Sequence, residues 1–320
     1  MNTQRISMEV KTMVFDAIVV GGGFAGLSAA MQLARARRRV LVVDSGLPRN
    51  RFAATSHGFL GQDGKAPAAI LREAAGQVAA YPTVEILHGE ALEARACRDR
   101  FTVALAGGRE TRARRLILAT GVIDTLPDLP GLNERWGATV LHCPYCHGYE
   151  VRDRSLGVLA SHPMAAHQAM LIPDWGPTTL FTQGQFEPDA EQRALLIARG
   201  VIIERQPVVA LLGNSPDLEA VRLADGRVIP IDAMFVAPST RMASPLAQQL
   251  GCAFDDGIFG PVIRVDDWKA TTTPGVYAAG DAARPMHNAT LASADGVLAG
   301  VGAHQSLAQD TSLIGVQPRH

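Results

Sequence analysis

The chain has 320 residues, of which 47% are hydrophobic and 19% charged, and its formal net charge is −1. This length gives room for about two domains, and the near-neutral charge gives no indication of nucleic acid or an anionic membrane as a partner. The sequence has no apolar stretch long enough for a transmembrane helix, and its first dozen residues are polar, so neither a membrane span nor secretion is expected. Only four cysteines occur, which fits a reducing cytoplasm.

The first elements follow the order strand, glycine turn, helix, strand and acid. Phe15–Val20 is a short apolar run that leads into Gly21-Gly22-Gly23-Phe24-Ala25-Gly26. A helix is predicted from there to about Ala36, and a second strand, Val40–Val43, leads to Asp44. This order is typical of a dinucleotide-binding unit.

The glycine turn fits the pattern G-x-G-x-x-G. Gly21 allows the tight turn, Gly23 lets the backbone approach a pyrophosphate, and Gly26 permits close packing of helix on strand. The helix N-terminus then faces the phosphates. Asp44 stands 23 residues after Gly21, where its carboxylate can accept hydrogen bonds from a ribose.

The next segment alternates a helix with short strands and then breaks. We expect a helix over 67–80 and strands over 84–88, 91–96, 101–106 and 115–119. The last strand ends in Ala119-Thr120-Gly121, and Pro127, Pro130 and Gly131 follow. We therefore place a domain boundary at this break.

Cys143-Pro144-Tyr145-Cys146 follows the break. Two cysteines at this spacing can close and reopen a small disulfide ring, which is typical of a redox-active dithiol. His142 and His147 flank the pair and can take up or supply the protons that thiol oxidation moves. A c-type haem attachment, a zinc site that uses the two histidines, and a buried structural pair are the alternatives.

A second strand–helix–strand pattern occupies the remaining half of the chain. It begins with a strand at Leu156–Ala160 and a helix at Pro163–Ile172. Further strands are expected over 178–181, 201–203, 208–211, 218–223 and 233–236, with a helix over 188–199. Pro238–Pro245 is predicted to be a return linker, after which a strand ends in Gly280-Asp281 and a long helix covers Asn288–Leu307.

Together, the early glycine turn, the Ala-Thr-Gly strand end, the Cys-x-x-Cys pair and the late Gly-Asp resemble the low-molecular-weight thioredoxin reductase family. The resemblance implies an α/β fold of two Rossmann-like, three-layer nucleotide-binding domains, usually in a homodimer. Residues 1–122 and 241–320 would form an FAD domain. Residues 123–240 would form the inserted, NADPH-domain-like region that carries the cysteine pair.

The resemblance also implies residue roles. Cys146 would be the thiol nearest the flavin, and Cys143 the one that exchanges with substrate. FAD would be bound by Gly21, Gly23, Gly26, Asp44, Asn50, Thr120, Gly121, Gly280, Asp281, Asn288 and Ala289. No metal is expected.

Three segments look like a subgroup that contains dithiol oxidases of disulfide-bearing natural products. They are His142-Cys-Pro-Tyr-Cys-His-Gly-Tyr-Glu150, Pro48-Arg49-Asn50 and His57-Gly-Phe-Leu-Gly61. Thioredoxin reductases typically carry an aspartic acid where this chain has His147. A neutral histidine can act as a base at pH 7, which suits oxidation of a dithiol, although a hydrogen-bonded structural role is an alternative.

The second nucleotide motif that the resemblance requires is degenerate. The corresponding run is Ala160-Ser161-His162-Pro163-Met164-Ala165, in which His162 obstructs the approach of a pyrophosphate and Pro163 lacks an N–H. Lysine and arginine are absent between Arg154 and Arg193, where a 2′-phosphate needs cations. NADPH binding is therefore doubtful. We expect an FAD-dependent oxidase of a small-molecule dithiol, with an NADPH-dependent reductase of a thioredoxin-like protein, or a flavin redox sensor, as alternatives.

Overall fold

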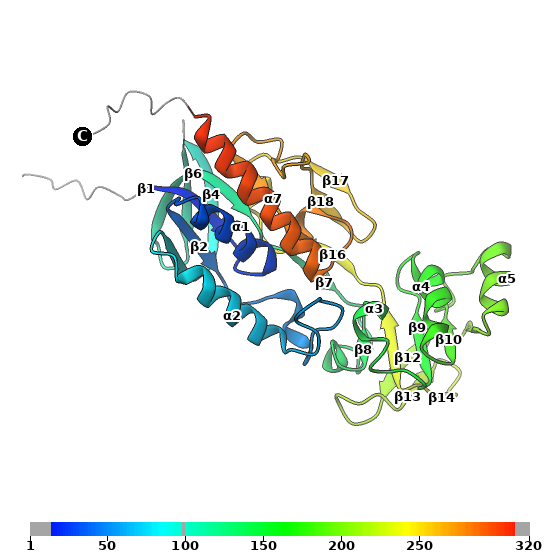
Figure 1. Ribbon diagram of the computed structural model, residues 1–320. Coiled ribbons are helices and arrows are strands. Elements are labelled where there is room, and N and C mark those ends of the chain that lie inside the picture. Colours follow the sequence, from blue (N-terminus) through cyan, green and yellow to red (C-terminus); the bar gives the residue numbers. More distant parts are fainter. Residues whose placement is uncertain (1–13, 98–99, 311–320) are drawn as a thin grey trace, which may run out of the picture.

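The computed structural model describes residues 14–97 and 100–310, which form two bodies that lie side by side (Figure 1). The larger body contains the first and the last described elements, and the smaller body is built from the middle of the chain. The polar first dozen residues lie outside the described residues. Every helix in the described part of the chain is too short or too polar to cross a membrane.

The larger body is built on a seven-stranded sheet. Its parallel strands run in the order β3 (Val84–His88), β2 (Val40–Asp44), β1 (Val14–Val20) and β6 (Glu110–Leu118), and β19 (Val276–Ala278) pairs with β6. An antiparallel extension follows on β6, made of β5 (Arg100–Leu105) and β4 (Ala91–Cys97). Strands buried on both faces read as continuous apolar runs, which is why β1 and β2 were recognisable in the sequence.

Helices cover one face of this sheet. α1 (Phe24–Arg35), α2 (Pro67–Ala79) and α7 (Ala289–Ala308) share a core with β1, β2 and β19. α7 lies directly against α1, because a Cβ at Gly296 would come within 2.0 Å of the Ala25 carbonyl oxygen. The other face packs on the β4–β5 extension and on α6 (Leu246–Gln249).

The smaller body has three layers. Its parallel sheet has the order β11 (Ile202–Glu204), β10 (Thr178–Phe181), β9 (Leu156–Leu159), β15 (Ala233–Val236) and β8 (Val140–Leu141). One face packs on α4 (Ala165–Leu171) and α5 (Ala190–Ala198). The other face packs on a meander of β12 (Val208–Leu212), β13 (Ala220–Leu223) and β14 (Val228–Pro230). The predicted α/β class, with a second domain inserted into the first, is confirmed.

Two strands that the sequence did not reveal connect the bodies. β7 (Val122–Thr125) leads out of the larger body and pairs antiparallel with β16 (Ser239–Met242), which leads back. A second missed element, the hairpin of β17 (Phe254–Asp256) and β18 (Pro261–Ile263), follows on the larger body. These strands are only three or four residues long and partly polar, so they carry no clear periodicity. The boundaries at residues 122 and 241 stay a prediction.

The remaining described elements are short helical turns: η1 (Arg49–Phe52), η2 (Asn133–Arg135), α3 (Pro144–His147), η3 (Ile172–Asp174) and η4 (Gly280–Ala283). The helix expected from Pro163 begins two residues later, at Ala165, and that expected from Pro188 begins at Ala190.

Candidate functional site

A cavity of about 880 Å³ opens at the carboxyl ends of β1 and β2 and extends to the cysteine pair. Ligands of open α/β sheets bind at this edge. All but one of the site residues predicted from the sequence line this cavity: Gly21, Gly23, Asp44, Asn50, Thr120, Gly121, His142, Cys143, Cys146, His147, Gly280, Asp281, Asn288 and Ala289. The exception, Gly26, is buried and does not line the cavity.

The first glycine turn has one open position and two that are tightly packed. Gly21 has φ +105°, and a Cβ there would come within 2.2 Å of the Ala119 carbonyl oxygen. A Cβ at Gly26 would lie 1.8 Å from the Gly21 carbonyl oxygen, so this position serves the packing of α1 on β1. Gly23 has nothing within 4 Å and is the N-cap of α1, whose first N–H groups receive no side-chain cap. Free donors beside open space suit a phosphate group.

Asp44 lies at the end of β2 beside this turn. Its Oδ1 accepts a hydrogen bond from the backbone N–H of Gly22 at 3.0 Å. A Cβ at Gly22 would come within 2.6 Å of the carboxylate carbon, so Gly22 is a further glycine that the motif requires here. Asp44 is therefore fixed at the rim of the cavity, where its second oxygen can accept a hydrogen bond.

Arg49 joins three parts of the site, and the sequence analysis assigned it no role. Its Nη1 lies 2.9 Å from Oδ2 of Asp281, and its Nε lies 3.0 Å from Oδ2 of Asp124 in β7. The three side chains are at most 20% exposed, so the pairs are shielded from water. Arg49 thus fixes Asp281, on the larger body, to the connecting strand. Its place in Pro48-Arg49-Asn50 was the available signal.

The start of α7 forms another part of the cavity wall. Asn288 is its N-cap, and its side-chain oxygen accepts hydrogen bonds from the N–H groups of Thr290 at 2.8 Å and Leu291 at 3.3 Å. The helix begins at Ala289, one residue after the start predicted from the sequence. Two of the N-terminal donors of α7 are thus already used, in contrast to those of α1.

The cysteine pair sits on α3, with Cys143 as N-cap and Cys146 one turn later; both are free thiols. The pKa of Cys143 is lowered, mainly because its sulfur accepts a hydrogen bond from the Cys146 thiol. The pKa of Cys146 is raised, because that thiol donates the hydrogen bond and because it is largely buried. In the reduced pair, Cys143 therefore ionises before Cys146.

The two histidines beside the pair differ in their surroundings. Burial lowers the pKa of His142 to about 4, and its Nδ1 lies 3.3 Å from the Val236 carbonyl oxygen. Burial also lowers the pKa of His147, while Glu150 acts in the opposite direction. Both imidazoles are therefore neutral at pH 7. Among the described residues, His142 is the imidazole of the two that contacts a backbone carbonyl oxygen.

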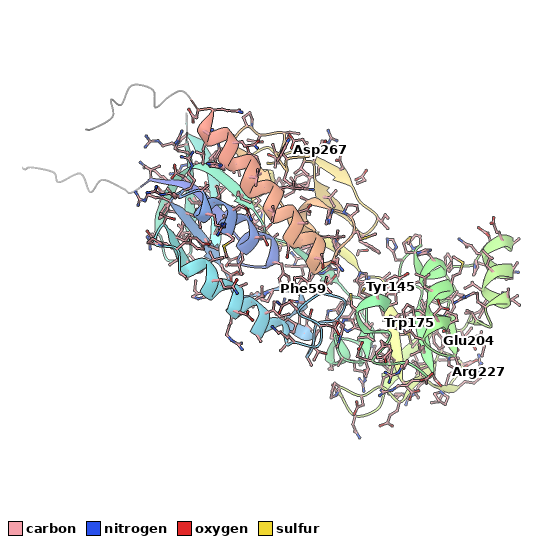
Figure 2. All side chains as sticks on the ribbon, in the orientation of Figure 1. Phe59, Tyr145, Trp175, Glu204, Arg227 and Asp267 are labelled. Carbon is pink, nitrogen blue, oxygen red and sulfur yellow. The ribbon has the colours of Figure 1, made fainter. Side chains whose placement is uncertain are left out.

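A loop of the larger body meets the segment just after α3 across the junction. His57 Nε2 lies 3.5 Å from Oε1 of Glu150, and its Nδ1 lies 3.5 Å from Oδ1 of Asp63. Figure 2 shows Phe59 on the larger body's side of the junction and Tyr145 on the side of α3. Tyr145 is 72% exposed and packs edge-to-face on Trp175. Sequence reasoning noted these segments only as motifs and assigned them no role.

The turn of the smaller body is occupied by its own residues. His162 Nδ1 accepts a hydrogen bond from the Met164 N–H at 3.2 Å, and the His162 carbonyl accepts from the Ala165 N–H at 2.9 Å. These are donors at the start of α4 that a phosphate would need. His162 therefore fills the turn as well as obstructing it.

The segment after β10 is also committed. Gln183, with φ +58°, exchanges hydrogen bonds with the backbone of Val208, at 2.7 Å from the Val208 N–H and 3.4 Å to its carbonyl. Arg193 and Arg205 reach this side of the body from other elements, and both pair with Glu187. Within residues 14–97 and 100–310, no cluster of three or more histidine, cysteine or acidic side chains could hold a metal ion.

Comparisons with known proteins agree with this geometry. A family model described as pyridine nucleotide-disulphide oxidoreductase matches residues 15–160 and 179–296. Thioredoxin reductase tcpT of Claviceps purpurea is 33% identical over 308 residues, which cover 93% of this chain and 95% of that protein. Thioredoxin reductase sirT of Leptosphaeria maculans is 31% identical over 306 residues, with 90% and 93% covered.

Solved structures show the same architecture. An oxidoreductase from Agrobacterium tumefaciens is 49% identical and superposes with a TM-score of 0.89, covering 93% of this chain and 100% of that one. The crystal structure of HlmI is 39% identical with a TM-score of 0.85, covering 92% and 93%.

Proposed function

This chain belongs to the pyridine nucleotide-disulphide oxidoreductase family, and we propose that within it the protein is an FAD-dependent oxidase that converts a dithiol into a disulfide. The family resemblance seen in the sequence is confirmed, and with it a flavin-dependent oxidoreductase that acts on sulfur groups. The choice of FAD, the direction of electron flow and the substrate are the proposed part.

The contrast between the two nucleotide turns carries the proposal. The turn of the larger body keeps open space at Gly23 and free donors at α1, which suit the pyrophosphate of FAD. The turn of the smaller body has its donors taken by His162, so it is poorly suited to NADPH. If NADPH does not deliver electrons, the dithiol must.

The first half of the proposed cycle, oxidation of the substrate, uses Cys143, Cys146 and His147. A substrate thiolate attacks the sulfur of Cys143 in the oxidised pair, which breaks the Cys143–Cys146 bond and releases Cys146 as a thiolate. The second substrate thiol then attacks the mixed disulfide, so the substrate leaves as a disulfide and the pair is left reduced by two electrons. His147 accepts a proton from the incoming thiols.

The cavity residues hold the cofactor for the second half of the cycle. Asp44 would bind the adenosine ribose, and Asp281, held by Arg49, would face the ribityl chain. Bound FAD would supply a two-electron acceptor for the reduced pair, with oxygen or another acceptor as the final oxidant. A homodimer is the assembly that the family resemblance suggests.

Anaerobic reduction of the FAD-loaded protein tests the direction of electron flow. We expect dithiothreitol to bleach the flavin absorbance and oxygen to restore it, while micromolar NADPH bleaches it slowly or not at all. Rapid stoichiometric bleaching by NADPH would establish the alternative, an NADPH-dependent reductase of a thioredoxin-like protein, which the names of the relatives support.

The same preparation tests the roles of the two cysteines. Cys143→Ser and Cys146→Ser should both abolish dithiol oxidation. With Cys143 replaced, Cys146 remains beside the flavin and should give a long-wavelength charge-transfer band, and the reverse variant should lack it. The opposite pattern would exchange the two assignments.

A further inference from the structure

Phe259 packs among three histidines that come from three different parts of the chain. It stands at the tip of the β17–β18 hairpin, on the larger body. Its ring centroid lies 5.5 Å from that of His142, 5.4 Å from that of His162 and 6.3 Å from that of His287. These separations lie within the range of favourable aromatic pairs. Phe259 therefore contacts both the residue beside the dithiol and the degenerate nucleotide turn.

The tip of the hairpin is fixed by its backbone. The Phe259 carbonyl accepts a hydrogen bond from the Thr240 N–H in β16 at 2.6 Å. The next residue, Gly260, has φ +155°, and a Cβ there would come within 2.1 Å of the Thr240 carbonyl oxygen. The ring thus projects from a hairpin that is packed against the connecting strand.

The partner on the smaller body is fixed as well. His162 holds the start of α4 through Nδ1, which sets the orientation of the ring that meets Phe259. Ser161, the preceding residue, donates a hydrogen bond to the Ala237 carbonyl at 3.3 Å. Hydrogen bonds within each body therefore hold both sides of this contact in place.

We propose that Phe259 is a positioning residue: its ring packs on His162 in the degenerate nucleotide turn and on His142 beside the dithiol, and thereby holds Cys143 and Cys146 toward the cavity of the larger body. His142 is adjacent to Cys143, so fixing His142 also fixes the start of α3. The degenerate nucleotide turn of the smaller body thus provides the contact surface for Phe259 of the larger body. This inference goes beyond the proposed function, since it concerns the placement of the dithiol and not its substrate.

The relative position of the two bodies can be measured directly in the flavin-loaded protein. Nitroxide-bearing amino acids are introduced genetically at Asp267 on the larger body and at Ala198 on α5, both exposed, which leaves the native cysteines intact. Pulsed electron paramagnetic resonance then gives the distribution of distances between the labels. We expect one narrow distribution in the otherwise wild-type protein.

Loss of the ring should broaden this distribution. We call molecules closed when Phe259 contacts His142 and His162, and open when the two bodies have separated there. Each aromatic pair changes the ratio of closed to open molecules roughly two- to tenfold, so Phe259→Ala should lower that ratio by about tenfold or more. His162→Asn tests the other side, because it keeps an acceptor for the Met164 N–H and removes the imidazole ring. Phe259→Tyr, which keeps the ring, and Ile258→Ala, an exposed neighbour on the same hairpin, should match the wild type.

A kinetic measurement, which rests on the proposed function, distinguishes a failure of this inference from a failure of that function. The rate of flavin reduction at saturating dithiothreitol should fall in Phe259→Ala in proportion to the closed fraction. A protein that is reduced by NADPH but shows the expected distances would refute the oxidase and leave the positioning role intact. If Phe259→Ala and His162→Asn both keep the narrow wild-type distribution, the positioning role is refuted.

Discussion

The two nucleotide turns of this chain share a fold and differ in what happens to the first N–H groups of the helix that follows. In the larger body, α1 begins at an uncapped glycine beside open space. In the smaller body, α4 begins at donors that His162 has already satisfied. A strand–turn–helix unit is therefore not by itself a nucleotide site, because an anion binds only where backbone donors remain free.

The first prediction concerns a substitution that disrupts the proposed phosphate site of the larger body and leaves its fold intact. Gly23→Asp places a carboxylate in the proposed phosphate site, so we expect FAD affinity to fall about 100-fold or more through charge repulsion and loss of charge-assisted hydrogen bonds. Aspartate is also a favoured N-cap, and Gly23 has an extended backbone, so the apoprotein should be as stable as wild type or slightly more. Equilibrium dialysis with FAD and thermal unfolding of the apoprotein measure the two effects.

A matched variant of the same turn gives the opposite pattern. Gly26→Ala should lower the stability of the apoprotein itself, since its Cβ would meet the Gly21 carbonyl oxygen. Full FAD affinity in Gly23→Asp would show that this turn does not hold the pyrophosphate.

The second prediction concerns His142, whose ring packs on Phe259. The pKa of His142 lies at about 4 in the folded protein, against 6.5 ordinarily, because the side chain is buried. Its contribution to stability is therefore complete above pH 6.5 and is lost as the pH falls toward 4. Between pH 7 and 4.5 we expect a loss of about 2–3 kcal/mol from this group.

Urea unfolding at the two pH values, with wild type and His142→Gln compared in saturating FAD, isolates this term. Glutamine cannot be protonated, so the variant should lose less stability on acidification. An equal loss in both proteins would assign the acid sensitivity to other groups, such as His147 and His287, whose pKa values burial also lowers.

The third prediction is that substitutions in the degenerate nucleotide turn of the smaller body will increase its affinity for a nucleotide. Ala160→Gly, His162→Gly and Pro163→Asp together restore the glycine pattern, and we expect NADP⁺ affinity to rise about tenfold. Adding Phe259→Ala should raise it further, because the ring faces the same turn. Calorimetric titration with NADP⁺ checks both steps, and unchanged affinity in the combined variant would mean that the turn is not the barrier.

We expect an arginine introduced for the 2′-phosphate to be more effective at Gln185 than at Gln183. Gln183 is bound to the backbone of Val208 by two hydrogen bonds, whereas Gln185 is exposed. Gln185→Arg should favour NADP⁺ over NAD⁺, since the added charge meets only the 2′-phosphate.

Much of this site could be predicted from the sequence because its motifs are local. Gly21, Gly23 and Asp44 belong to one strand–turn–helix–strand unit, and Cys143 and Cys146 to one helical turn, so spacing alone brings each group together. Arg49 and Phe259 could not be assigned in this way. Arg49 acts through Asp124 and Asp281, which are 75 and 232 residues away in sequence, and Phe259 acts through His142 and His162 on the other body.

The last and smallest effect concerns the third helix N-terminus, that of α7, which lines the cavity but is capped by Asn288. Asn288→Ala removes the acceptor for the N–H groups of Thr290 and Leu291, so we expect a loss of about 1 kcal/mol in the free energy of unfolding. Asn288→Asp keeps an acceptor at the cap and should retain wild-type stability in the apoprotein. If α7, like α1, served mainly as an anion site, Asn288→Ala would free two donors and raise FAD affinity; unchanged or lower affinity, measured by the same dialysis, would show that the cap is structural and that α1 alone keeps its donors for the cofactor.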